Sequence, residues 1–120
     1  MNRERIERLA AEIERRELDC LALVPGANLV YLTGLHFHLG DRPTMALFVP
    51  GRRPALVLPA LELRKADGLD LDLYPWSDEE GFQGAFQRAG IELGLAGKQI
   101  GVEAFTMRVV EMRLLEQMAR

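Results

Sequence analysis

The sequence has few of the features that mark secreted and membrane proteins. Its 120 residues contain one cysteine, Cys20, and no apolar run that approaches the roughly 20 residues of a membrane-spanning helix. A single cysteine cannot form an internal disulfide, and its apolar neighbours favour a reduced thiol. The segment from Met1 to Arg5 is polar and charged, so no signal peptide is expected. We therefore expect a cytoplasmic protein without a membrane partner.

The sequence also lacks an excess of basic charge. Lysine and arginine together number 15 against 18 aspartates and glutamates, which gives a net charge of -3. Nucleic-acid-binding proteins usually carry a basic patch and a high pI, so no nucleic-acid partner is expected. The remaining composition, 48% hydrophobic and 28% charged, is typical of a globular protein, and the length suits one domain.

The common catalytic signatures are absent as well. There is no GxGxxG or GxxxxGK motif, which excludes the usual dinucleotide fingerprint and the P-loop. The only serine, Ser77, lies outside a GxSxG motif, and neither HExxH nor CxxC occurs. Cys20 lies within an apolar run, which favours a buried structural thiol over a nucleophile. The sequence therefore predicts no catalytic residue and no common metal centre in this chain.

Short apolar runs alternate with amphipathic segments along the chain. This interleaving is typical of α/β proteins, and the turn-rich link 50–54 joins two apolar runs into a predicted antiparallel hairpin. We expect one α/β domain over residues 1–120, with a mixed sheet of about five strands flanked by helices. The predicted strands are Cys20–Val24, Met45–Val49, Ala55–Leu58, Leu71–Trp76 (near a sheet edge) and Gln99–Glu103, and the predicted helices are Asn2–Glu17, Ala27–Leu32, Ala60–Ala66, a segment from Ser77 to Ala89, and Met107–Ala119.

The first helix has a predicted cap and predicted ion pairs. Asn2 is a potential N-cap, because its side chain can accept a hydrogen bond from a free backbone N–H. The pairs Glu4/Arg8 and Glu12/Arg16 have the favourable i, i+4 spacing on the charged face.

Two later helices also carry specific expectations. Ser77 with Glu80 forms the pattern of a capping box, so Asp78–Glu80 is interpreted as the first turn of a helix and Gly90–Lys98 as the loop after it. The last helix is expected to turn one stripe toward the core, made of Met107, Val110, Leu114 and Met118.

The loop Leu35–Pro43 holds the candidate functional residues His36, His38, Asp41 and Arg42. Two histidines at i, i+2 on an extended segment point the same way and could share a metal ion, but they need further ligands, and Asp41 is the only acid nearby. A solvated or interface-forming loop is the favoured interpretation. Arg42 could bind a carboxylate through two nitrogens or remain exposed without a partner.

The segment Asn28–Gly34 resembles the N-x-x-Y-L-T-G segment of a known family, the N-terminal domains of creatinase, prolidase and aminopeptidase P. The surroundings agree, since a D-x-L strand (Asp19, Leu21) follows an amphipathic helix and I-G-V-E (Ile100–Glu103) precedes another helix. The order and spacing of these motifs extend the similarity over nearly the whole chain.

This resemblance implies a non-catalytic N-terminal domain of a proline-specific metallopeptidase, an Xaa-Pro dipeptidase or aminopeptidase. In that family a C-terminal "pita-bread" domain supplies two aspartates, a histidine and two glutamates, which hold two divalent ions (Mn, Co or Zn). None of these ligands maps onto this chain, so no cofactor is expected within it. The resemblance further implies a homodimer, a short proline-containing peptide as substrate, and a substrate-restricting role for His36–Arg42 near the neighbouring subunit's active site.

Three other functions remain open. A catalytically inactive peptide- or protein-binding module with the same fold occurs in relatives among histone-chaperone subunits. Creatinase-type amidinohydrolases use the same architecture, so the substrate need not be a peptide. A small metal-binding protein that uses His36 and His38 is the third. The presence or loss of the five metal ligands in the downstream reading frame separates the peptidase from the binding module.

Overall fold

The structure is a computed structural model that describes all residues from Met1 to Arg120. Its middle layer is a five-stranded mixed sheet with the strand order β4-β3-β2-β1-β5. Strand β2 runs antiparallel to β1 and β3, whereas β4 pairs in parallel with β3 and β5 in parallel with β1. The mixed sheet, the β2–β3 hairpin and the edge position of β4 are confirmed. The strands are β1 (Cys20–Leu23), β2 (Met45–Phe48), β3 (Ala55–Pro59), β4 (Asp72–Trp76) and β5 (Ile100–Val102).

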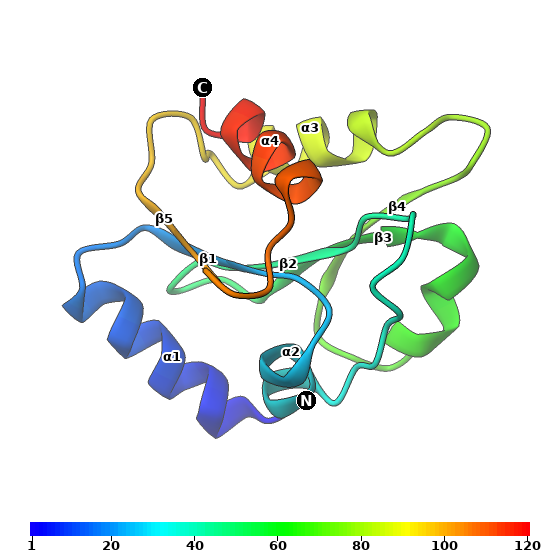
Figure 1. Cartoon of the computed structure of the whole chain (residues 1–120). Coiled ribbons are helices and arrows are strands. Elements are labelled where there is room, and N and C mark those ends of the chain that lie inside the picture. Colours follow the sequence, from blue (N-terminus) through cyan, green and yellow to red (C-terminus); the bar gives the residue numbers. More distant parts are fainter.

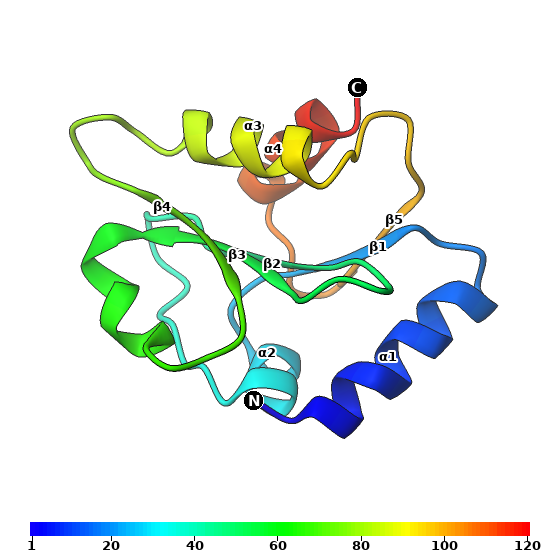
Figure 2. The ribbon, with the colours of Figure 1, turned by 180° about the vertical axis from the view of Figure 1, so that it is seen from behind.

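Helices cover both faces of the sheet, as Figures 1 and 2 show from opposite sides. Two helices, α3 and α4, lie on one face, and α1 and α2 lie on the other. The short 3-10 helix η1 packs on the same side as α1 and α2 through Ala66. The helices are α1 (Arg3–Arg15), α2 (Ala27–Thr33), η1 (Ala60–Ala66), α3 (Gln83–Glu92) and α4 (Val109–Met118). No helix has the length and apolar character needed to cross a membrane.

The three central strands, β1, β2 and β3, are apolar because each contributes to two cores. Successive side chains of a strand point to opposite faces of the sheet. In β2, Met45 and Leu47 therefore belong to the core beneath α3 and α4, whereas Ala46 and Phe48 belong to the core beneath α1 and α2. All four are buried. The continuous apolar runs in the sequence are the signature of this three-layer arrangement.

The first helix begins where its sequence predicts, but one predicted ion pair is missing. The Asn2 side chain accepts a hydrogen bond from the Arg5 N–H at 3.0 Å, which confirms the N-cap. Glu12 pairs with Arg16 at 2.8 Å. The Glu4–Arg8 pair does not form, and Arg8 instead lines a cavity between α1 and α2.

The predicted helix start at Ser77 is wrong, although the hydrogen bonds of the capping box are present. Ser77 Oγ accepts the Glu80 N–H at 3.2 Å and donates to Glu80 Oε1 at 3.1 Å. These bonds close a separate turn, because Gly81 adopts a positive φ of 79° that ends any helical path. Helix α3 begins only at Gln83 and continues to Glu92, so part of the loop predicted from Gly90 is helical.

The predicted inward stripe of the last helix is correct in part. Leu114 and Met118 are buried, but Val110 is 36% exposed, and the neighbouring Glu111 is 0% exposed. The buried Glu111 carboxylate accepts hydrogen bonds from the Arg108 side chain and from the Arg108 backbone N–H at 3.1 Å. A glutamate satisfied in this way can occupy a core position that a sequence pattern reserves for an apolar residue.

Candidate functional site

The loop with the candidate residues lies at the carboxyl edge of the sheet. Strands β1, β3, β4 and β5 run parallel to one another, so their C-terminal ends meet at one edge. The antiparallel strand β2 begins at that same edge, and Leu35–Pro43 leads into it from α2. In open α/β sheets, ligand sites form outside the carboxyl ends of the strands. We call Leu35–Pro43 the carboxyl-edge loop.

The end of the N-x-x-Y-L-T-G segment directs the chain into this loop. Gly34 takes the left-handed conformation (φ 77°), and its N–H donates to the Val30 carbonyl at 2.8 Å, which ends α2. The buried Thr33 hydroxyl donates to the Leu29 carbonyl at 2.7 Å and accepts the Leu35 N–H at 3.1 Å. The threonine and glycine of the segment therefore form a helix C-cap that sets the direction of the loop.

Side chains from three other elements fasten the backbone of the carboxyl-edge loop. Each donates a hydrogen bond to a loop carbonyl, and the three donors come from η1, from β4 and from the residue before α4. Lys65 Nζ donates to His36 O at 2.9 Å, Arg108 Nη1 to Gly40 O at 2.7 Å, and Trp76 Nε1 to Pro43 O at 3.2 Å. The loop is thus held at its beginning, middle and end.

The contact to Gly40 is linked to an ion pair between the half-buried Arg108 and the buried Glu111. Arg108 binds both carboxylate oxygens of Glu111, and the Glu111 side chain is completely buried. This charge-assisted contact raises the pKa of the Arg108 guanidinium above its ordinary value. It also orients the guanidinium so that its remaining nitrogen reaches the Gly40 carbonyl. No local sequence pattern reports this link, because Arg108 and Gly40 lie 68 positions apart.

Arg42 binds Asp78 through two parallel hydrogen bonds. Nε lies 2.9 Å from Oδ1 and Nη2 lies 2.7 Å from Oδ2. The hydrogen bonds raise the pKa of Arg42 and lower that of the Asp78 carboxyl. Of the two roles considered for Arg42, carboxylate binding is the one that forms. The assignment of Asp78 to a helix N-terminus was wrong because α3 starts five residues later, at Gln83.

The other three candidate side chains remain exposed, and the two histidines do not face the same cavity. His36 lines a hollow beside Val30 and Tyr31 of α2, whereas His38 and Asp41 line a separate cavity of about 130 Å³. The two imidazoles therefore border different cavities. The structure brings His38, Asp41 and Arg42 together around one cavity and places His36 apart.

The chain's own residues do not fit a metal centre. No three His, Cys, Asp or Glu side chains lie close enough to hold a metal ion. Cys20 is completely buried, and this burial raises its pKa to about 12, so the thiolate is inaccessible at neutral pH. Glu103 is committed to structure, since it accepts the Val24 N–H at 3.0 Å and the Asn28 amide at 2.9 Å.

The comparisons with known proteins agree on the type of domain. A family model described as the creatinase/prolidase N-terminal domain matches residues 5–120. A dipeptidase from Pyrococcus horikoshii has a TM-score of 0.84 and 25% identity, over 96% of this chain and 32% of its own. The dipeptidase PepE from Mycobacterium ulcerans has a TM-score of 0.81 and 27% identity, over 95% and 31%. This chain therefore spans about a third of the length of either dipeptidase.

A solved single domain resembles this chain over most of both lengths. The creatinase/prolidase N-terminal domain of an X-Pro dipeptidase from Streptococcus pyogenes has a TM-score of 0.84 over 98% of this chain and 89% of its own. Its identity is 18%, so the likeness establishes the shared fold alone. Comparison with curated proteins finds no match.

Proposed function

This chain belongs to the creatinase/prolidase N-terminal domain family, and from that premise we propose that it is the non-catalytic N-terminal domain of an Xaa-Pro metallopeptidase. Residues 1–120 form this one domain, and the dinuclear metal site (Mn, Co or Zn) lies on a C-terminal domain outside the chain. The similarity to two dipeptidases that are about three times longer supports this division. The absence of any three clustered ligand side chains in this chain is consistent with it.

The carboxyl-edge loop is the part of the domain that meets the substrate. Its backbone is held at three carbonyls, while the side chains of His38 and Asp41 remain exposed. This combination of a fixed backbone with exposed charged and polar side chains is the observation that carries the proposal. A wall of this kind limits a cleft to short peptides, and its charged groups orient their ends. Arg42 contributes by fixing the loop through Asp78.

The proposal includes the quaternary context of the family. The protein is a cytoplasmic homodimer in which the carboxyl-edge loop approaches the active site of the neighbouring subunit. His36, which faces a different hollow from His38, is then available for the contact between subunits. The substrate is a short peptide that contains proline.

The first experiment separates the domain from its proposed catalytic neighbour. The purified 120-residue chain, assayed with Xaa-Pro dipeptides and added manganese or cobalt, is expected to show no cleavage. The downstream reading frame is expected to encode the two aspartates, one histidine and two glutamates of the dinuclear site. Cleavage by the chain alone would contradict the proposal. Loss of the five ligands would instead favour the inactive binding module.

The second experiment tests the loop in the longer protein. Asp41→Asn is expected to raise KM for Xaa-Pro dipeptides and to weaken discrimination against longer peptides, while the metal content stays the same. Asp67→Asn is the matched control, because Asp67 is also an exposed aspartate but lies after η1. If the two variants have the same KM and the same length preference, the loop does not contact substrate.

A further inference from the structure

A second cavity lies away from the carboxyl-edge loop, between α1 and α2. It measures about 470 Å³ and has an apolar floor formed by Leu9, Leu21, Leu23 and Leu32. Cavities of this size, lined mainly by apolar side chains with a few polar groups, are the usual form of small-molecule sites. We call it the α1–α2 cleft. Its polar groups decide which class of molecule it can take.

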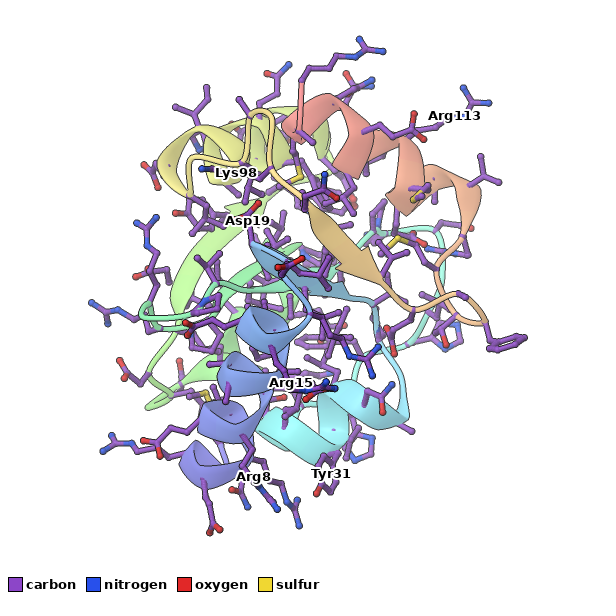
Figure 3. All side chains as sticks on the ribbon, turned by 90° about the vertical axis from the view of Figure 1, so that its left-hand side faces the viewer. Arg8, Arg15, Asp19, Tyr31, Lys98 and Arg113 are labelled. Atoms are coloured by element: carbon purple, nitrogen blue, oxygen red, sulfur yellow. The ribbon has the colours of Figure 1, made fainter.

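Arg8 is the free cation of the α1–α2 cleft. Its i, i+4 neighbour Glu4 does not pair with it, although the equivalent Glu12–Arg16 pair on the same helix forms at 2.8 Å. Arg8 instead lines the cleft opposite Tyr31, and Figure 3 shows the two residues beside each other on α1 and α2. An unpaired guanidinium at the rim of an apolar cavity is a binding group for a carboxylate.

Arg5 is a second cation, and its position is fixed. Its Nη1 donates to the Tyr31 carbonyl at 2.9 Å, and its guanidinium carbon lies 3.9 Å from the centre of the Tyr31 ring. These contacts hold the guanidinium at the cleft and leave further N–H groups available. Arg5 therefore supplies a preorganised charge to the same cleft that Arg8 lines.

Both charged residues that line the α1–α2 cleft are arginines. None of the residues that line it is acidic, although 18 of the 120 residues of the chain are aspartate or glutamate. Asn28 is the only other strongly polar residue in the lining, and its amide nitrogen is held by Glu103 at 2.9 Å. That bond leaves the amide oxygen of Asn28 as an acceptor at the rim. The cleft thus combines two cations, one neutral acceptor and a leucine floor.

We propose that the α1–α2 cleft binds a small monocarboxylate with an aliphatic body. The carboxylate lies between Arg8 and Arg5, and the aliphatic part covers the leucines. Charge-assisted hydrogen bonds from two guanidinium groups select the anion, and burial of methylene groups selects a molecule longer than acetate. This site is independent of the carboxyl-edge loop and of the proposed peptidase role.

Hexanoate is the probe for the test, with hexan-1-ol as the uncharged molecule of the same length. Each is titrated into the 15N-labelled chain, and the amide resonances are followed by NMR. With hexanoate we expect saturable shifts, with a millimolar Kd, at Leu9, Leu21 and Tyr31. Hexan-1-ol is expected to bind at least tenfold more weakly, because it makes no charge-assisted bond.

Two variants make the test specific. Arg8→Gln is expected to weaken hexanoate binding roughly tenfold, the equivalent of one charge-assisted hydrogen bond. Arg64→Gln is the matched control, because Arg64 is an exposed arginine on η1, outside the cleft, and it is expected to leave the Kd unchanged. Equal affinity of the Arg8→Gln variant and the unmodified chain would overturn the proposal. So would equal binding of hexan-1-ol, or shifts that do not saturate.

Discussion

The two helical layers of this domain, α3–α4 and α1–α2, cover opposite faces of the same sheet. The helices of the first pair lie closer together than those of the second. On one face, Phe86 is 1% exposed, and Gly90 lies so near α4 that a Cβ there would be 3.0 Å from Met118 Cβ. On the other face, α1 and α2 are joined by polar contacts, since the Asn2 N–H donates to the Leu32 carbonyl at 2.9 Å and Arg5 binds Tyr31. An open cleft of about 470 Å³ remains between them.

The difference arises from the residues at the helix crossings. Small residues, Ala89 and Gly90, allow α3 to approach α4 closely. Between α1 and α2 the corresponding space is bordered by arginine and tyrosine, whose polar ends remain in water while their stems cover apolar surface. We therefore expect the α3–α4 layer to contribute more to stability than the α1–α2 layer, which contains the open cleft.

The largest expected effect comes from truncating one apolar side chain in each layer and comparing the losses in unfolding free energy. Phe86→Ala should lower the free energy of unfolding by about 3–5 kcal/mol, because it removes a buried ring that packs edge-on against Phe82 at 6.4 Å between ring centres. Leu9→Ala, at the partly exposed floor of the α1–α2 cleft, should cost about 1 kcal/mol. Urea denaturation measures both. Equal losses of unfolding free energy in the two variants would contradict the expected difference in stability between the layers.

The next prediction concerns the contact through which the α3–α4 layer holds the carboxyl-edge loop. Glu111→Gln should lower the free energy of unfolding by about 2 kcal/mol, because a buried charge-assisted contact to Arg108 is weakened. Since Arg108 also holds the Gly40 carbonyl, hydrogen exchange of the loop amides should quicken more than exchange in β1.

The matched control for this prediction is Glu116→Gln, an exposed glutamate of the same helix. It should change neither the unfolding free energy nor loop exchange measurably. A loss in Glu111→Gln no greater than in Glu116→Gln would show that the ion pair does not support the loop.

Local patterns were sufficient to predict the sheet and most helices, but not the contacts that build the site. Apolar runs located the three central strands, and an alternating segment located β4 at the sheet edge. The Asn2 side chain marked the start of α1, and Gly34, which readily adopts the left-handed conformation, marked the end of α2. The Arg42–Asp78 and Arg108–Gly40 contacts join residues 36 and 68 positions apart, so no local spacing reports them. The loop could be selected as a candidate from its composition, whereas its attachment required the three-dimensional structure.

The helix boundaries that were missed have a similar explanation. Ser77 and Glu80 satisfy the pattern of a capping box, and they form its bonds, but Gly81 then turns into the left-handed region. Glycine is compatible with either a helix or a reversal, so the choice depends on how Phe82 packs against Trp76, at 5.6 Å between ring centres. Tertiary packing decided a boundary that local chemistry left open.

The smallest expected effect concerns the exposed Arg42–Asp78 pair, which ties the carboxyl-edge loop to the turn before α3. The hydrogen bond from Arg42 lowers the pKa of Asp78 below the ordinary value of 3.8. A carboxyl whose pKa is depressed in the folded state contributes stability above its unfolded pKa, and that contribution is lost as pH falls through the folded value. During an acid titration, the NMR resonance of the Arg42 Nε–H should therefore shift only at pH values below those at which an ordinary aspartate titrates.

Asp78→Asn should abolish this low-pH shift of the Arg42 Nε–H resonance. Asp67→Asn should leave the shift in place, because Asp67 is an exposed aspartate without an arginine partner. The global unfolding free energy should change little in either variant, because the pair is exposed to water that screens its charges. The effect should thus be confined to the loop, in contrast to the whole-domain loss expected from Phe86→Ala. An acid transition that persists unchanged in Asp78→Asn would assign the titration to another carboxyl and leave the loop held by its carbonyl contacts alone.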